Sequence, residues 1–258
     1  MDRFLNKVVV VTGAAQGIGE TVSLDFYNEG ATVCMLDLNL DALEQVAATK
    51  QADRSQMCLW KVDISDSEQV NAVFGAIGAR FGRIDILVNN AGVIKRCLAE
   101  EATDAQIRLM VDVNLLGPMF CTRAAIPHMK NIGANIVNVS SILATFPNTG
   151  AGVYGATKAG IMVLTRVWAA ELAPYGIRVN CYAPGIVETP MSADVIQTRA
   201  ESKLAQIALR RFGKTQDIFN LISFYCSDQA SYITGQSIGI DGGIWATQTP
   251  NAAWRLND

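Results

Sequence analysis

The chain has 258 residues, of which 50% are hydrophobic and only 17% are charged, and its formal net charge is −3. These values exclude a disordered chain, because a soluble domain is typically about 25% charged and a chain of this length buries roughly 70–75% of its surface. So small a net charge provides no basic field for a phosphodiester backbone, and we expect no nucleic-acid partner.

The beginning of the chain lacks the apolar core of a secretory signal, and no run of about 18 apolar residues follows it. We therefore expect no membrane segment and a cytoplasmic location. The six cysteines are scattered without a Cys-x-x-Cys pair, which predicts reduced thiols rather than disulfides or a metal cluster. His128 is the single histidine, so the sequence offers neither a Ser-His-Asp triad nor a His-rich zinc site, and we expect no metal.

Short β-branched runs alternate with helical patterns along the chain. The runs are continuous in hydrophobicity, as strands buried on both faces are. Capping boxes at Ser65 and Thr103 predict two helix starts, and apolar periodicity predicts long helices over 103–131 and 154–173. This order predicts one domain over 1–258, an α/β, doubly wound parallel sheet of Rossmann-like type with helices on both faces. About seven strands are expected, at 8–11, 31–36, 57–62, 84–88, 135–139, 178–182 and 237–240.

The first predicted strand runs into a Gly-x-x-x-Gly-x-Gly motif. Gly13 permits a tight turn, Gly17 lacks the Cβ that would block a pyrophosphate, and Gly19 permits close packing of the following helix. The free N–H groups at the start of that helix attract phosphate. Glycines alone explain only a turn, but the strand before them and the helix after them favour a dinucleotide site.

A carboxylate at the end of the second predicted strand indicates which dinucleotide is bound. Asp37 lies 24 positions beyond Gly13, where it can accept hydrogen bonds from the ribose hydroxyls of NAD and repel the 2′-phosphate of NADP. No lysine or arginine stands at positions 14, 15 or 38 to offset that repulsion, so we expect NAD rather than NADP. Asp63, after the third strand, either contacts the adenine amino group or starts the next helix.

Further motifs follow in a set order. They are Asn89-Asn90-Ala91-Gly92, Ser140-Ser141, Tyr154-Gly155-Ala156-Thr157-Lys158, Pro184-Gly185 and Ile240-Asp241-Gly242-Gly243. With the glycine motif they span almost the whole chain, and in this order and spacing the sequence resembles the classical short-chain dehydrogenase/reductase family. The resemblance implies an NAD(H)-dependent oxidoreductase that transfers a hydride between nicotinamide and a secondary alcohol or ketone.

The resemblance implies a catalytic group of Asn114, Ser141, Tyr154 and Lys158. Tyr154 and Lys158 are four residues apart and share one helix face. A free tyrosine titrates near pH 10, so the adjacent ammonium and the positive nicotinamide must favour its phenolate before it acts as an acid–base group. The family spacing assigns Ser141, and not Ser140, to the substrate oxygen. Asn114 either holds a water of a proton relay or is a hydrogen-bonded core amide that bends its helix.

The implied cofactor site draws residues from both halves of the chain. Asn90 and Gly92 are expected beside the ribose and nicotinamide, and Thr189 beside the carboxamide, with a helix N-cap as the alternative role of Thr189. The complete set is Gly13, Gln16, Gly17, Ile18, Gly19, Asp37, Asp63, Ile64, Asn90, Ala91, Gly92, Tyr154, Lys158, Pro184, Gly185, Val187 and Thr189.

Substrate choice is expected in segments 94–96 and 142–147, at Ala151, and in a substrate lid over about 190–212. Lys95, Arg96 and Arg199 in these segments either attract a phosphate or carboxylate or are solvated surface charges. We expect a small-molecule substrate, and favour a polyol, sugar acid or small hydroxyketone over a steroid.

Two rival functions and one assembly complete the expectations. The rivals are a catalytically silent NAD-binding regulator or scaffold of the same fold, and a dehydratase or epimerase of the extended type, whose chains are usually longer. The predicted helices over 103–131 and 154–173 resemble the pair that joins subunits in this family, which implies a homotetramer.

Overall fold

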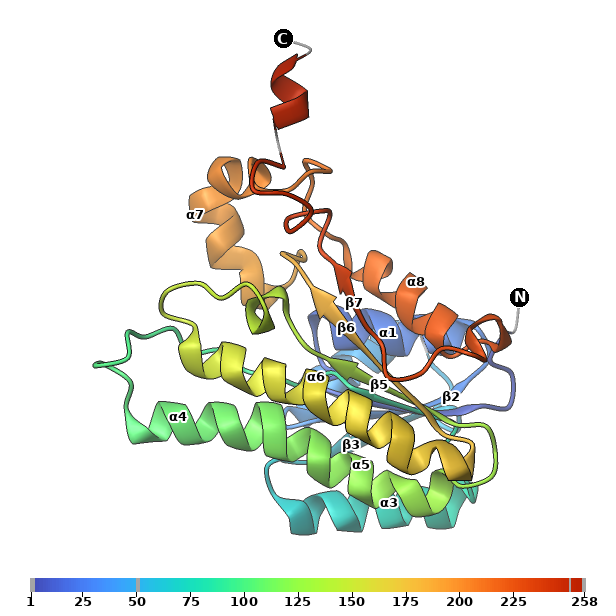
Figure 1. Ribbon diagram of the computed structural model, residues 1–258. Helices are drawn as coiled ribbons and strands as arrows, with labels where there is room; N and C mark the ends of the chain where they lie inside the picture. Colours follow the sequence, from blue (N-terminus) through green and yellow to red (C-terminus); the bar gives the residue numbers. More distant parts are fainter. Residues whose placement is uncertain (1–2, 50–51, 251, 257–258) are drawn as a thin grey trace.

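The computed structural model describes residues 3–49, 52–250 and 252–256. Their strands form one parallel seven-stranded sheet in the order β3-β2-β1-β4-β5-β6-β7, with helices packed on both faces (Figure 1). This architecture confirms the predicted doubly wound α/β fold. The strands are β1 Val8–Thr12, β2 Thr32–Asp37, β3 Met57–Lys61, β4 Ile86–Asn89, β5 Asn135–Val139, β6 Arg178–Pro184 and β7 Ser237–Ile240.

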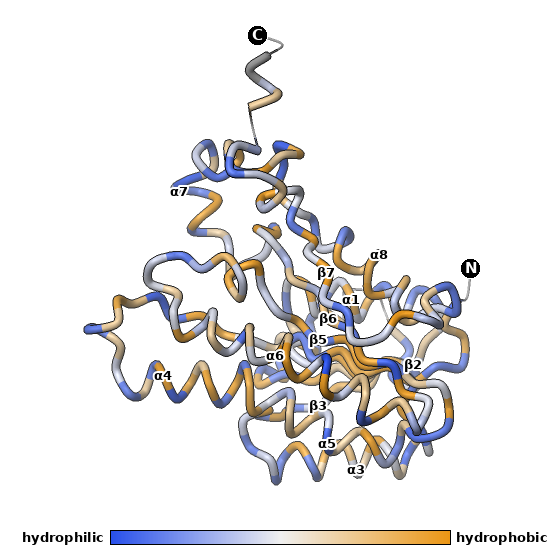
Figure 2. The backbone as a smooth tube through the Cα atoms, viewed as in Figure 1, coloured by the Kyte–Doolittle hydropathy of each residue, from blue (hydrophilic) through white to orange (hydrophobic). Residues whose placement is uncertain are grey.

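The strand sequences explain the buried sheet. Every residue of β1 and of β5 is buried. β-branched side chains pack well on a pleated surface, and a strand covered on both faces has no solvent side, so its apolar run is continuous. Figure 2 shows mostly orange strands at the centre, surrounded by helices along which blue and orange alternate.

Two layers of helices cover the sheet. On one face α1, α2 and α8 bury apolar side chains such as Val22 and Phe219, and on the other α3, α5 and α6 bury Phe74 and Leu172. The helices are α1 Gly17–Asn28, α2 Leu40–Thr49, α3 Ser67–Phe81, α4 Asp104–Val111, α5 Gly117–Met129, α6 Gly152–Leu172, α7 Ala193–Leu204 and α8 Thr215–Tyr225.

The two predicted capping boxes have different outcomes. Thr103 caps α4 within a capping box, as predicted. The predicted cap at Ser65 is wrong, because α3 begins after Asp66, whose carboxylate accepts from the backbone N–H of Gln69 at 3.2 Å. An ionised carboxylate is a stronger acceptor than a hydroxyl, and the Ser65 hydroxyl instead donates to Asp63 at 2.6 Å.

The predicted continuous helix over 103–131 is interrupted. A π-helical stretch, Asp112–Leu116, separates α4 from α5, so the prediction of a single regular helix is wrong. By length and composition alone, residues 104–129 could cross a membrane, contrary to the expectation drawn from the sequence. In this fold, however, α5 packs against α3 and α4 packs against α6, as helices of a protein interior do.

Gly19 sets the distance between α1 and the end of β1. A Cβ on this residue would lie 2.0 Å from the carbonyl oxygen of Gly13, and a backbone atom cannot rotate aside. We expect Gly19→Ala to lower the free energy of unfolding, measured by urea titration, by roughly 1–3 kcal/mol. The matched control is Gly75→Ala in α3, where no atom lies within 4 Å of the added methyl, and the helix should gain up to about 1 kcal/mol. Equal effects of the two substitutions would contradict this packing account.

Candidate active site

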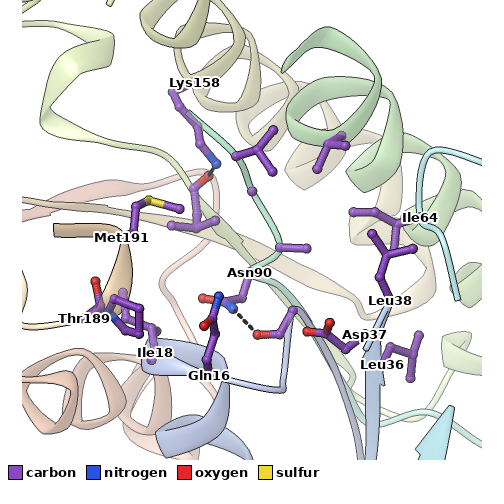
Figure 3. A pocket seen from close by; sticks show the side chains of 18 of the residues that line it. Gln16, Ile18, Leu36, Asp37, Leu38, Ile64, Asn90, Lys158, Thr189 and Met191 are labelled. Atoms are coloured by element: carbon purple, nitrogen blue, oxygen red, sulfur yellow. Dashed lines mark hydrogen bonds between the residues drawn. The ribbon is translucent and has the colours of Figure 1, made fainter. Parts of the chain in front are cut away.

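A cleft of about 380 Å³ opens at the carboxyl ends of the strands, where the strand order reverses between β1 and β4. Ligands of open parallel sheets bind at such switch points, and the volume suits a small-molecule site. Figure 3 shows Asp37 and Leu38 toward one end of the cleft and Lys158 and Met191 toward the other. The cleft is lined by most of the predicted cofactor set, namely Gly13, Gln16, Gly17, Ile18, Asp37, Asp63, Ile64, Asn90, Ala91, Gly92, Tyr154, Lys158, Pro184 and Thr189.

Three predicted cofactor residues shape the backbone around the cleft instead of lining it. Gly19 brings α1 against the end of β1. A Cβ on Gly185 would lie 2.8 Å from the Cα of Asp241, so this position admits only glycine without a shift of the backbone. Val187 is buried and pairs with Gly213 in an isolated β-bridge. These three residues are therefore not part of the cleft wall, and their contact with a cofactor stays a prediction.

The glycine turn has the conformation that its sequence predicts. Gly13 and Gly17 have φ of +65° and +60°, a left-handed region that other residues rarely adopt. A Cβ on Gly13 would lie 2.8 Å from the Cα of Ala91, so glycine lets this turn approach the loop after β4. Gln16 precedes α1 without a side-chain cap, which leaves the first N–H groups of the helix available to an anion. This cradle fits the pyrophosphate of a dinucleotide.

Backbone hydrogen bonds hold Asp37 in place. Its Oδ2 accepts from the N–H of Ala15 at 3.1 Å and its Oδ1 from the N–H of Asn39 at 3.0 Å. The cap of α2 is Asn39, whose Oδ1 accepts from the N–H of Ala42 at 3.0 Å, so Asp37 is not used for that purpose. Among the described residues that line the cleft, Lys158 is the only lysine or arginine, and it lies far from this carboxylate.

Asp63 serves its own turn and also lines the cleft. Its Oδ1 accepts from both the N–H and the hydroxyl of Ser65, at 2.9 and 2.6 Å. The apolar walls beside it include Leu36 and Val62, which sequence reasoning missed. Only their positions at strand ends could have indicated them, because buried strand residues of this kind occur throughout the sheet.

Asn90 ties two loops of the site together. Its Nδ2 donates to the carbonyl oxygens of Thr12 and Gly13 at 3.1 and 3.2 Å, and its Oδ1 accepts from the Tyr182 hydroxyl at 3.2 Å. The Thr12 hydroxyl accepts in return from the N–H groups of Asn90 and Ala91 at 3.0 and 3.1 Å. Sequence reasoning placed Asn90 beside the ribose and missed Thr12 and Tyr182. The Asn90 amide holds the cleft wall in position.

α6 carries Tyr154 and Lys158, and the loop after β5 brings Ser141 beside them. Lys158 is only 2% exposed; its Nζ donates to the carbonyl oxygen of Val139 at 3.1 Å and lies 5.8 Å from the centre of the Tyr154 ring. The Ser140 hydroxyl donates to the carbonyl oxygen of Lys158 at 2.8 Å, whereas the Ser141 side chain is within hydrogen-bonding reach of Tyr154. Ser140 thus anchors the helix, and Ser141 faces the phenol.

Burial dominates the titration of this group. It raises the pKa of Tyr154, and the Ser141 hydrogen bond and the charge of Arg96 offset only part of that rise. Burial also lowers the pKa of Lys158 to about 8. The side chains alone therefore do not bring the pKa of Tyr154 below its usual value. The expectation that the ammonium and a positively charged nicotinamide together favour the phenolate stays a prediction.

Asn114 is fully buried within the π-helical stretch. Its Nδ2 donates to the carbonyl oxygen of Val93 and its Oδ1 accepts from the N–H of Val93, both at 2.8 Å. These bonds match the core-amide alternative for its side chain, because the amide fastens the loop after β4 to the helix. Gly92 lies against this group, since a Cβ there would be 3.2 Å from Asn114 Oδ1 and 3.3 Å from Lys158 Nζ.

The segment predicted as a lid folds as a short 3-10 turn, Pro190–Ser192, followed by α7. Thr189 begins the turn within a capping box and also lines the cleft, so both of its expected roles are compatible with the structure. Met191 lines the cleft as well, whereas no residue of α7 is buried. The tail reaches the same region, where the ring of Trp245 packs edge-on against Phe146 at 6.0 Å.

A dinucleotide bound along the cleft from Asp37 to Lys158 would have the buried phenol of Tyr154 at one end. Within the described ranges, no three histidine, cysteine, aspartate or glutamate side chains gather in a group that could hold a metal ion. Fold and cleft together define a nicotinamide-dependent oxidoreductase. Residues 13–245 match the family model described as enoyl-(acyl carrier protein) reductase, and the chain belongs to the short-chain dehydrogenase/reductase family.

Relatives cover nearly the whole chain. A 3-oxoacyl-[acyl-carrier-protein] reductase FabG of Thermotoga maritima is 39% identical over 243 residues, which are 94% of this chain and 99% of the relative. A trans-4-hydroxycyclohexanecarboxylate dehydrogenase of Sinomonas cyclohexanicum is 38% identical over 250 residues, 94% of each chain. Among solved structures, a short-chain glucose/ribitol dehydrogenase of Brucella melitensis superposes with a TM-score of 0.91 at 34% identity, covering 94% of this chain and 98% of that one.

The buried amine of Lys158 costs stability at neutral pH. Its pKa of about 8 lies below the usual 10.5, so below pH 8 the folded chain holds a charge that burial disfavours, and this cost fades as the pH approaches 10.5. We expect Lys158→Met to raise the free energy of unfolding at pH 7 by roughly 1–3 kcal/mol, and by clearly less at pH 10.

Urea titrations at both pH values measure this difference. Lys61→Met, at an exposed lysine of β3, is the control and should leave the stability nearly unchanged at both. A Lys158→Met protein that is less stable than the wild type at pH 7 would show that the amine strengthens the fold.

Proposed function

We propose that this protein is an NAD(H)-dependent oxidoreductase that transfers a hydride between nicotinamide and a secondary alcohol or ketone. The observation that carries the proposal is the buried pair of Tyr154 and Lys158, which line one end of a cleft whose other end presents the Asp37 carboxylate, with Ser141 buried beside Tyr154. A redox cofactor bound along this cleft meets an acid–base group at its reactive end. Oxidation of a carbinol removes a hydride and a proton, so it requires both a redox cofactor and an acid–base group.

Each side chain has a defined task in this proposal. Bound nicotinamide accepts or supplies the hydride. Tyr154 takes the hydroxyl proton in the oxidation and returns it to the carbonyl oxygen in the reduction, while Ser141 donates a hydrogen bond to the same oxygen and keeps it near the phenol. Lys158, with a pKa of about 8, is mostly protonated at pH 7 and stabilises the phenolate electrostatically. Asn114 acts as a positioning residue that holds the loop beside Lys158.

We further propose NAD(H) rather than NADP(H) as the cofactor. The Asp37 carboxylate is fixed at the end of β2, where it accepts hydrogen bonds from ribose hydroxyls and repels a 2′-phosphate. Relief of that repulsion would need a cation beside the ribose, and the next position carries the exposed Leu38.

The names of the relatives support the reaction class. A 3-oxoacyl group, a 4-hydroxycyclohexane ring and ribitol all contain a ketone or a secondary alcohol. A polyol, sugar acid or small hydroxyketone remains our proposed substrate range. The alternative is a catalytically silent NAD-binding regulator or scaffold, and the retention of Ser141, Tyr154 and Lys158 around the cleft favours the enzyme.

We also propose a homotetramer that works in the cytoplasm. Several apolar side chains on α5 and α6 are exposed, as is typical of a face that a second subunit covers. These are Met119, Val163 and Val167, at 37%, 58% and 44%. All six cysteines are free thiols, which fits a reducing compartment.

Tyr154→Phe tests the acid–base assignment. The variant keeps the ring and loses the titratable hydroxyl, so we expect the turnover of a secondary alcohol with NAD⁺ to fall by roughly 10²- to 10⁴-fold. NADH formation, followed by absorbance over a panel of polyols, hydroxy acids and hydroxyketones, measures the loss. NADH binding, followed by fluorescence, should change little. Tyr175→Phe, at a tyrosine outside the cleft, is the control, and undiminished turnover in Tyr154→Phe would refute the proposed function.

Asp37→Ala tests the cofactor preference. Loss of charge-assisted hydrogen bonds to the ribose should lower kcat/KM for NAD⁺ by roughly 10- to 100-fold, while NADP⁺ gains through the loss of repulsion. Asp41→Ala, at an exposed carboxylate on α2, should leave the ratio of the two kcat/KM values unchanged. A wild type that prefers NADP⁺, or an Asp37→Ala variant that affects both cofactors equally, would contradict the assignment.

A further inference from the structure

A network of four buried polar side chains crosses the core between α5 and α6. Its members, in spatial order, are Thr122 on α5, Asn89 on β4, Asn138 on β5 and Thr165 on α6. Asn89 Nδ2 donates to Thr122 Oγ1 at 3.1 Å and to Asn138 Oδ1 at 2.9 Å. Asn138 Nδ2 in turn donates to Thr165 Oγ1 at 2.9 Å. None of the four residues is more than 2% exposed, so their polar atoms depend on one another.

Core packing alone does not require an amide at position 138. Side chains alternate along a strand, so Asn138 points to the same face of β5 as Ile136, which packs in an apolar cluster with Ala169 and Leu172 of α6. An apolar side chain would suit these surroundings, whereas a buried amide is costly unless it is paired. A fully paired amide instead gives two neighbouring elements a fixed relative position. The network therefore contributes direction rather than burial.

Asn89 determines which way the Asn138 amide points. The two asparagines are paired residues of β4 and β5, and the Asn138 Oδ1 accepts from Asn89 across the strands. The Nδ2 of Asn138 consequently faces α6, where it donates to Thr165. The sheet thus holds this amide in the orientation that reaches the helix.

β5 and the residue that follows it hold α6 at two points. One point is Thr165. The other is Lys158, whose Nζ donates to the carbonyl oxygen of Val139 at 3.1 Å and whose own carbonyl oxygen accepts from the Ser140 hydroxyl at 2.8 Å. At 1.5 Å per residue, Thr165 lies roughly 10 Å along the helix from Lys158, and Tyr154 lies roughly 6 Å from Lys158 on the other side. A sideways movement of about 1 Å at Thr165 would therefore move Tyr154 by roughly 0.6 Å in the opposite direction.

We propose that Asn138 and Thr165 are positioning residues, which set the direction of α6 and thereby the distance between the Tyr154 phenol and Ser141. The inference rests on the proposed function for the chemistry of Tyr154 and adds two residues on which that chemistry depends, although neither lines the cleft. Tyr154 and Ser141 must contact the same substrate oxygen. A displacement of a fraction of an ångström therefore lowers the rate.

Thr165→Val tests the proposal. Valine has nearly the shape of threonine and lacks the hydroxyl, so Asn138 loses its acceptor on α6 while the helix keeps its packing. We expect the single-turnover rate of NADH formation from a secondary alcohol and NAD⁺ to fall roughly 10-fold or more. The KM for NAD⁺ should change little, because Asp37 is held by bonds that do not involve α6.

A second pair of variants isolates the hydroxyl. Thr165→Ser and Thr165→Ala lose the same methyl group and differ in the hydroxyl alone. We expect Thr165→Ser to keep most of the rate and Thr165→Ala to lose as much as Thr165→Val. This pair decides the question if Thr165→Val does not fold.

Thr122→Val is the matched control. It makes the same substitution at the other end of the network, on α5, and leaves the bond between Asn138 and Thr165 in place. Urea titrations should show a loss of stability in both valine variants. The single-turnover rate should fall in Thr165→Val and stay nearly unchanged in Thr122→Val, a difference that a merely structural role of the network would not produce.

Crystal structures make the test independent of turnover. With the strands superposed, we expect α6 to change direction in Thr165→Val and the Tyr154 hydroxyl to move relative to Ser141 by on the order of 0.5 Å. Neither should move in Thr165→Ser or Thr122→Val.

The outcomes separate the two proposals. An unmoved α6 or a full rate in Thr165→Val, or an equal loss of rate in Thr122→Val, would overturn the positioning role. Tyr154-dependent oxidation of alcohols by the wild type would leave the proposed function standing in that case. Conversely, a displaced Tyr154 in the Thr165→Val crystal, together with no turnover of any alcohol by the wild type, would retain the role of the two residues in placing Tyr154 and refute the oxidoreductase.

Discussion

The cleft depends on how the ends of β1 and β4 are tied together across the point where the strand order reverses. Thr12 and Asn90 exchange hydrogen bonds through both backbone and side chain, and Tyr182 on β6 completes the network. Without this connection, the glycine turn after β1 and the loop after β4 would have no hydrogen bonds to hold them together, because the helices that follow them lie on opposite faces of the sheet. With it, the glycine turn and the loop that ends at Gly92 form one wall, and Gly92 in turn lies against Lys158 and Asn114.

The proposed acid–base group lies where burial makes its charged forms costly to the fold. Tyr154 and Lys158 are almost fully enclosed, and burial disfavours the charged form of both, which raises the pKa of one and lowers that of the other. A lysine that keeps its charge at pH 7 and a phenol that needs added positive charge are poor choices for stability. They suit a site in which the phenol of Tyr154 ionises only after a positively charged nicotinamide binds beside it. The phenol of the free protein would then stay protonated.

Regular features of the site could be predicted from the sequence, and features that depend on a neighbour in space could not. The glycine turn and Asp37 follow strands whose apolar runs are unmistakable, so their positions at the carboxyl edge followed from local pattern. The cap of α3 was misplaced by one residue because Ser65 and Asp66 both fit a cap, and only the bond from Ser65 to Asp63 decides between them. The π-helical stretch around Asn114 was missed for the same reason, since an amide anchored on a loop 21 positions earlier leaves no periodic signal.

The segment predicted as a lid is fixed to the fold by fewer buried contacts than the rest of the site. The wall of the cleft is fixed by buried strands and by amide networks, and substitutions there would disturb the fold. α7 buries no residue and has a break at Arg199, so its side chains can vary without a cost to the core. The side chains of α7 are therefore free to vary, whereas the residues proposed for the chemistry lie on elements that the sheet and its helices hold in place.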